Sequence, residues 1–197
     1  MVGFSRHAMT PWRSKPTGDC AASRGLKIWG RARYDFAMRK VNIQDVPVEP
    51  WDSPKGKFGC RSRNISIALG RVERSDLKSE SHPFDLELCT VPAGRAMCPY
   101  HSHSAQTEMY VVVAGRGQVR AADGVTDVGP GDAFIFAPYE PHQMIASATE
   151  DLTFYIIADD PPSDSCHYPD SDKWSVPARP KRRLIRGIDV DYHDGEE

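Results

Sequence analysis

Short apolar runs follow one another along the chain from about residue 62. They lie at residues 65–69, 84–91, 109–113, 133–137 and 152–158, and several of them alternate apolar with polar positions. Each run is rich in β-branched or aromatic residues, and Gly, Pro or Asp-Gly separates it from the next. This pattern predicts many short β-strands at close spacing, which is typical of a β-sandwich or barrel.

The turns between these runs carry their own signals. Asp123-Gly124 separates residues 118–121 from residues 125–128, and a glycine there tolerates the positive φ of a tight hairpin. Gly129-Pro-Gly-Asp132 marks the next break between strands. After the last strand, residues 159–180 are rich in Pro and Asp, so we expect a loop that wraps the barrel, followed by a solvated charged terminus.

Composition and charge limit the classes of function. The chain has 197 residues, 40% of them hydrophobic, and a formal net charge of -2, which does not favour a nucleic-acid or membrane-surface partner. No apolar run approaches the roughly 20 residues that span a bilayer, so we expect a soluble, cytoplasmic protein. The five cysteines form no CxxC pair, which indicates reduced thiols.

Four segments are expected from these patterns. Residues 1–37 form a basic extension, and residues 38–61 an arm that packs on the barrel. The barrel itself spans residues 62–160, and residues 161–197 form the wrap and the charged tail. The basic leader has the composition of a transit peptide, but Met38 also opens a natural protein start; the second interpretation is preferred.

Metal-ligand residue types gather in one stretch. His101 and His103 lie two residues apart and so point the same way in an extended chain, and a turn can return Glu108 beside them. His142 follows a Pro-containing bend at the end of another strand. Neutral imidazoles together with a carboxylate are ligands for zinc, iron, manganese, nickel or copper. The other histidines, His7, His82, His167 and His193, are assigned no role.

These residues resemble the two sequence motifs of the cupin superfamily. Residues 94–115, with HxHxxxxE followed by six residues and a glycine, resemble the first motif, and residues 131–142 resemble the second. The resemblance implies an all-β double-stranded β-helix, a jelly-roll barrel with N- and C-terminal extensions. It also implies one divalent transition metal (Zn, Fe, Mn or Ni) bound by four residues: His101, His103, Glu108 and His142. The chain departs from the second motif at Ala137, Tyr139 and Ala146, none of which is a ligand.

The flanking sequence is similar to that of a bacterial cupin group provisionally named for sugar-phosphate isomerisation. We therefore expect a metal-dependent enzyme acting on a small polar metabolite, with Glu140 or Tyr139 moving the proton. Other polar groups are candidates to face that ligand: Arg95, Tyr100, Gln106 and Arg120. An iron-dependent dioxygenase, a non-catalytic small-molecule sensor and a barrel with a purely structural metal are the alternatives. Small cupins commonly pair, so a homodimer is expected.

Overall fold

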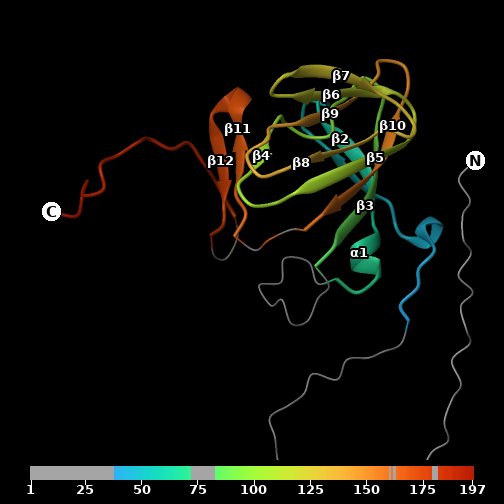
Figure 1. The fold of residues 1–197 in the computed structure, drawn as a ribbon, viewed down its shortest axis with the longest axis horizontal. Coiled ribbons are helices and arrows are strands. Elements are labelled where there is room, and N and C mark those ends of the chain that lie inside the picture. The colour runs from blue at the N-terminus through green and yellow to red at the C-terminus, as the bar shows by residue number, and fades with distance from the viewer. Residues whose placement is uncertain (1–37, 72–82, 160, 162, 179–181) are drawn as a thin grey trace, which may run out of the picture. The chain divides into compact units, whose positions relative to one another are not determined.

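In the computed structural model the regular elements are mostly antiparallel β-strands, which form three sheets in the described part of the chain (Figure 1). The structure describes residues 38–71, 83–159, 161, 163–178 and 182–197. The basic extension predicted for residues 1–37 lies outside the described residues. An all-β fold was the prediction from the apolar runs, and the strands confirm it.

The largest sheet has six strands in the order β1-β2-β3-β10-β5-β8. Every pairing in it is antiparallel. Four of the predicted runs are confirmed as strands within it. The strands are β1 (Glu49–Asp52), β2 (Gly59–Asn64), β3 (Asp85–Val91), β10 (Leu152–Ala158), β5 (Glu108–Ala114) and β8 (Ala133–Phe136).

A three-stranded sheet lies over part of the first. Its order is β7 (Gly124–Val128), β6 (Gly117–Ala121) and β9 (Gln143–Ala146). The hairpin predicted at Asp123-Gly124 is confirmed, because Ala121 pairs with Gly124 and Gly124 has a φ of 139°. Only glycine adopts such a φ without strain, and this explains the turn.

The third sheet joins the C-terminal segment to the middle of the chain. Its order is β13 (Arg183–Ile185), β12 (Lys173–Val176), β11 (Cys166–Tyr168) and β4 (Ser102–His103). Figure 1 shows β11 and β12, in orange, beside β4. A segment that the sequence predicts to be a wrapped loop therefore adds strands, and it does so directly against the strand that contains His103.

One predicted strand is wrong. Residues 65–69 read as a short alternating run, but Ile65–Ala68 form the α-helix α1. The Asn64 side chain accepts a hydrogen bond from the Ile67 amide at 3.0 Å, and Leu69 N–H donates to the Ile65 carbonyl at 3.0 Å. An N-cap of this kind satisfies an amide that the first helical turn leaves without a partner, so local capping overrides the apolar pattern. The described residues also form two 3-10 turns, η1 (Ile43–Asp45) and η2 (Pro169–Ser171).

The core lies between the six-stranded and three-stranded sheets. Along β5, Glu108, Tyr110 and Val112 are buried while Met109 is exposed, which is the alternation of a strand with one face inward. The Tyr110 and Val112 side chains thus face the interior. Their neighbours in the cluster come from the other strands: Cys89, Val91, Val119, Val128, Met144, Ala146, Leu152 and Phe154.

Gly115 fixes the end of β5. Its φ is 76°, and a Cβ atom at this position would lie within 1.7 Å of the Asp151 carbonyl oxygen. Both the conformation and the close backbone approach therefore require glycine. The helical segments within the described ranges fall well short of the length and hydropathy that crossing a bilayer demands.

Candidate metal centre

Four polar side chains meet inside the fold at the edge of the core. The two segments that contain His101 and His142 are joined by a pair of backbone hydrogen bonds, His101 N to His142 O at 3.2 Å and His142 N to His101 O at 2.8 Å. His103 lies in β4, and Glu108 is the first residue of β5. The structure thus brings together the four residues whose spacing suggested a metal site. All four are between 1% and 9% exposed.

The donor atoms of these side chains lie close to one another. Glu108 Oε2 is 2.8 Å from His142 Nε2, and Glu108 Oε1 is 3.5 Å from His103 Nε2. The His101 ring centroid lies 5.0 Å from that of His103 and 4.8 Å from that of His142. One donor atom from each of His101, His103 and Glu108 falls within 4.8 Å of the other two, a separation that one ion can bridge. The cluster could therefore hold a metal.

Each of the three imidazoles has one nitrogen engaged outside the cluster. When Nδ1–H donates a hydrogen bond, Nε2 keeps its lone pair, and this is how proteins prepare histidine as a metal ligand. The three Nδ1 atoms contact the Pro99 carbonyl at 2.9 Å (His101), Asp164 Oδ2 at 2.7 Å (His103) and the Glu140 carbonyl at 3.0 Å (His142).

The Nε2 atom of His103 indicates whether the cluster suits a metal. Its Nε2 atom is fully buried and makes no hydrogen bond within the described part of the chain. A buried polar nitrogen without a partner is costly, so such atoms call for an explanation. A cation among three imidazoles and a carboxylate would supply the missing partner, and the donor set therefore fits a borderline transition metal.

The charges in the cluster shift the pKa values of its members in opposite directions. Burial disfavours protonated His103, but hydrogen bonding to Asp164 outweighs this and raises its pKa to about 10. Burial also opposes ionised Glu108, yet the hydrogen bond with His142 and the charge of His103 lower its pKa to about 2. Burial and the neighbouring His142 lower the pKa of His101 to about 4. Glu108 is therefore an anion at neutral pH, ready to face a cation.

Two neighbours orient the Glu108 carboxylate. The Tyr110 hydroxyl, which is completely buried, donates to Glu108 Oε2 at 2.7 Å and lies 3.2 Å from His142 Nε2. Gln106 Nε2 donates to the other oxygen at 3.4 Å. The Phe136 ring stacks on His142 with centroids 4.2 Å apart, which fixes the plane of that imidazole.

Asp164 is the residue that sequence reasoning missed. It lies beyond β10, is 4% exposed, and contacts His103 through Oδ2. Burial raises its pKa, but the hydrogen bond with His103 and two backbone amides outweigh burial and lower it to about 2. The sequence around it is Pro- and Ser-rich with no periodic pattern, so no local signal separates this aspartate from its neighbours Asp159 and Asp160.

The predicted catalytic pair lies on the turn before His142. Tyr139 is 72% exposed and has a φ of 70°, and its backbone amide donates to the His103 carbonyl at 2.7 Å. The Glu140 carboxylate accepts the Ala137 amide at 2.7 Å, which closes the turn. The structure thus brings the backbone of this turn to the cluster, while the Tyr139 side chain extends into solvent.

The candidate arginines are engaged with aspartates. Arg95 Nη1 lies 2.5 Å from Asp52 Oδ1, and Arg120 binds both oxygens of Asp170 at 2.7 Å. The Arg120 guanidinium also stacks on the Tyr100 ring, 3.8 Å from its centroid. These contacts account for both positive charges without a bound anion.

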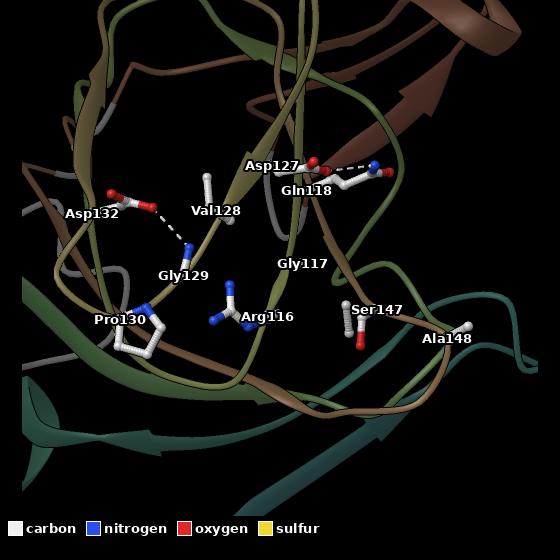
Figure 2. A pocket seen from close by; sticks show the side chains of 11 residues that line it. Arg116, Gly117, Gln118, Asp127, Val128, Gly129, Pro130, Asp132, Ser147 and Ala148 are labelled. Atoms are coloured by element: carbon white, nitrogen blue, oxygen red, sulfur yellow. Dashed lines mark hydrogen bonds between the residues drawn. The ribbon is translucent and has the colours of Figure 1, made fainter.

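An open groove of about 670 Å³ lies away from the cluster (Figure 2). Arg116 lies in it, and hydrogen bonds join Gln118 to Asp127 and the Gly129 amide to Asp132 at its walls. The remaining lining residues are Gly117, Val128, Pro130, Ala146, Ser147 and Ala148. None of the four clustered side chains lines this groove.

Comparison with known proteins identifies the domain. A family model described as "Cupin domain" matches residues 87–158, a range that includes all four clustered residues. No curated protein matches the chain.

Solved structures share the fold at low sequence identity. A protein of Acidithiobacillus ferrooxidans, provisionally named sugar phosphate isomerase, is 19% identical with a TM-score of 0.64, over 75% of this chain and 91% of its own. A cupin-superfamily sugar phosphate isomerase of Silicibacter pomeroyi is 19% identical with a TM-score of 0.62, over 75% and 92%. The polyketide cyclase RemF of Streptomyces resistomycificus is 20% identical with a TM-score of 0.51, over 79% and 89%. At these identities the likeness shows the fold alone. Together with the family match, it establishes that this chain carries a cupin domain at residues 87–158.

Proposed function

We propose that the chain is a metal-dependent enzyme acting on a small polar metabolite, with one divalent transition metal bound by four side chains: His101, His103, Glu108 and His142. The observation that supports this most directly is the arrangement of the imidazoles. All three engage Nδ1 elsewhere, and the buried Nε2 of His103 lacks a hydrogen-bond partner in the described structure. Buried polar atoms without a hydrogen bond are uncommon in native structures, so a bound cation gives this nitrogen a physical explanation.

The donor set of three imidazoles and a carboxylate suits zinc, iron, manganese or nickel. When bound, such an ion supplies a Lewis acid that polarises a carbonyl or enediolate oxygen of the substrate. The residues of this chain supply the orientation: Tyr110 fixes Glu108, and the Pro99, Asp164 and Glu140 oxygens hold the three rings.

We propose proton transfer by Glu140 or Tyr139, which precede His142 on the same turn. The Glu140 carboxylate would have to leave the Ala137 amide to reach a substrate, since it now accepts that hydrogen bond at 2.7 Å. A general acid or base must come within hydrogen-bonding distance of the proton that it moves. Glu140→Gln and Tyr139→Phe are the variants that separate the two candidates.

Sugar phosphates are the first substrate class to test. Two of the structures with the same fold carry sugar phosphate isomerase in their names, although at 19% identity they support only the fold. A phosphate would need a cation, and Arg95 or Arg120 would have to exchange its aspartate partner to provide one. Iron in place of zinc or manganese would direct the assays to dioxygenation.

The test is elemental analysis of protein purified without added metal, followed by assays with aldose and ketose phosphates. A stoichiometric transition metal and multiple turnover would support the proposal. Metal without turnover, but with a melting temperature that rises on adding a sugar phosphate, would instead support a non-catalytic binding module. Absence of metal in protein that also fails to bind added Zn²⁺, Mn²⁺ or Fe²⁺ would refute the metal centre.

The homodimer and the cytoplasmic location remain predictions. Light scattering on the eluting peak of a size-exclusion column would settle the first, because a single chain has a mass of 22.0 kDa. A peak at that mass would contradict the dimer.

A further inference from the structure

The Asp164 side chain connects the C-terminal segment to the candidate metal centre through both of its oxygens. Oδ2 accepts the hydrogen bond from His103 Nδ1 at 2.7 Å. Oδ1 accepts from the Ala105 amide at 2.9 Å, from the Gln106 amide at 3.3 Å and from the Ser104 hydroxyl at 3.3 Å. One carboxylate thus holds a candidate ligand and the three residues that follow it.

We propose that Asp164 is a positioning residue that aims His103 Nε2 at the metal, so that the centre depends on a segment outside the cupin domain. The inference rests on the proposed metal centre. A carboxylate on Nδ1 fixes both the ring orientation and the tautomer in which Nε2 is free to bind a cation. Its second oxygen fixes the loop that leads from His103 to Glu108, so both ligands are set together.

The backbone around Asp164 is itself held in place. Cys166 pairs with His103, and His167 pairs with Ser102, in the β11–β4 ladder. The adjoining loop adds three bonds between Ser104 and Ser165: amide to carbonyl at 2.8 Å, amide to hydroxyl at 2.8 Å and hydroxyl to hydroxyl at 3.0 Å. Such a frame restricts Asp164 to a single position against the imidazole.

A different role for the same atoms is a second metal site. Cys166 Sγ lies 3.6 Å from His103 Nδ1 and 3.8 Å from Asp164 Oδ2, so the three residues resemble a donor set. The other contacts of Asp164 favour the positioning role, because its second oxygen already accepts hydrogen bonds from two backbone amides and a hydroxyl. The number of Co²⁺ ions bound per chain distinguishes the two roles.

The experiment measures Co²⁺ affinity of the full chain by competition with a chelator, together with the visible spectrum of bound Co²⁺. Asp164→Asn replaces one carboxylate oxygen by an NH2 group, which cannot accept a hydrogen bond. Either His103 Nδ1–H or the backbone amides of Ala105 and Gln106 then lose their acceptor, and the orientation of His103 is disturbed. We expect affinity to fall by about 10- to 100-fold, as with other partners of metal-bound histidine, and the Co²⁺ bands to change. Asp170→Asn is the matched control, because its carboxylate pairs with Arg120 in the same segment.

The His103→Ala background separates positioning from a general structural role. If Asp164 acts mainly through His103, then Asp164→Asn should lower Co²⁺ affinity much less once His103 is absent, and any remaining loss measures the effect of its second oxygen on the loop to Glu108. Circular dichroism of the chelator-treated variants verifies that each is folded at the assay temperature.

Three results would overturn the inference, and they differ in what else they affect. Unchanged affinity in Asp164→Asn, or an equal loss in the His103→Ala background, would refute the positioning role and leave the metal centre standing. Two Co²⁺ ions per wild-type chain would make Asp164 a ligand. Failure of the wild-type chain to bind Co²⁺ at all would refute the metal centre, and the positioning role with it.

Discussion

The polar groups near the two ends of β9 differ in their burial and in their hydrogen-bond partners. At the end that begins after His142, four metal-ligand side chains are at most 9% exposed, and nearly every polar atom has a partner. At the end marked by Ala146, the groove around Arg116 is open, and its polar groups pair with close neighbours such as Gln118 with Asp127. The same sheet thus ends in an enclosed cluster on one side and an open groove on the other.

This difference shows that the size of a cavity and the convergence of ligand side chains are separate properties. The groove has a volume but no convergent set of ligand types, and both of its aspartates already accept hydrogen bonds. The enclosed cluster is the opposite case, because it has a buried nitrogen without a hydrogen-bond partner in the described structure, beside an ionised carboxylate. Perturbed groups that gather in one place are the better indicator of function.

The largest effect should come from removing two ligands. The His101→Ala, His103→Ala double variant should lose bound metal, from about one ion per chain to background, because two of four donors are absent. If the metal stabilises the fold by mass action, about 4 kcal/mol of unfolding free energy is lost when the metal had been present at a thousandfold excess over Kd. Elemental analysis and urea unfolding measure the two effects. Retention of stoichiometric metal would contradict the assignment of the cluster.

Next in size is the response of the metal-free protein to pH. The pKa of His103 rises from its ordinary value of 6.5 to about 10 on folding, so protonated His103 stabilises the metal-free fold fully below pH 6.5. That contribution is lost as the pH rises from 6.5 toward 10. Between pH 6.5 and 8.5 the chelator-treated protein should lose about 2 kcal/mol, whereas the metal-loaded protein, in which His103 is already deprotonated, should not.

Other buried groups titrate in or near this pH window. Burial raises the pKa of Glu87 to about 7, so Glu87 adds a smaller loss of stability above pH 6.5. Burial raises the pKa of the Cys98 thiol, which would add its own loss of stability above about pH 8.5, so the comparison ends there. In chelator-treated His103→Gln the slope over this window should fall to the smaller part that Glu87 contributes. Urea unfolding at several pH values measures it, and an equally steep slope in the variant would assign the effect to another group.

The sequence predicted the all-β class and the four clustered residues for a physical reason, although it missed α1 and the strands β11 to β13. Strand parity places His101 and His103 on one side, and the buried strand 108–114 shows its alternation directly in the apolar run. The hairpin at Gly124 follows from a single turn residue. These are local properties that a pattern of neighbouring residues can encode.

The contacts that orient the clustered side chains could not be predicted from the sequence, because they join segments that lie far apart in the chain. Asp164 binds His103, which lies 61 positions earlier in the chain. This contact depends on the pairing of β11 with β4, which no local periodicity predicts. The strand prediction for residues 65–69 was wrong for the opposite reason. There the pattern was visible, but one capping side chain, Asn64, decided the local conformation in favour of a helical turn.

A smaller effect is expected from deleting one hydroxyl at the enclosed end. Tyr110→Phe keeps the ring against Phe134, 5.5 Å between centroids, but removes the donor to Glu108 Oε2. Loss of a hydrogen bond to a charged acceptor should lower the free energy of unfolding by about 1.5–3 kcal/mol. Tyr155→Phe, on the half-buried outer side of β10, is the matched control and should cost under about 0.5 kcal/mol. Equal effects of the two substitutions, measured by urea unfolding, would remove any special role of the Tyr110 hydroxyl.

The smallest effect is expected in the groove. Arg116→Ala removes the cationic side chain that lines it within the described part of the chain, yet the backbone carbonyl of Arg116, which accepts the Ser147 amide at 3.0 Å, remains. Stability should change by less than about 0.5 kcal/mol, and metal content and any turnover should be unchanged, because no residue of the candidate centre lies in this groove. Elemental analysis and the same assays test this. A fall in turnover or in substrate affinity would place the working site at the open end of β9, and the comparison between the two ends would then reverse.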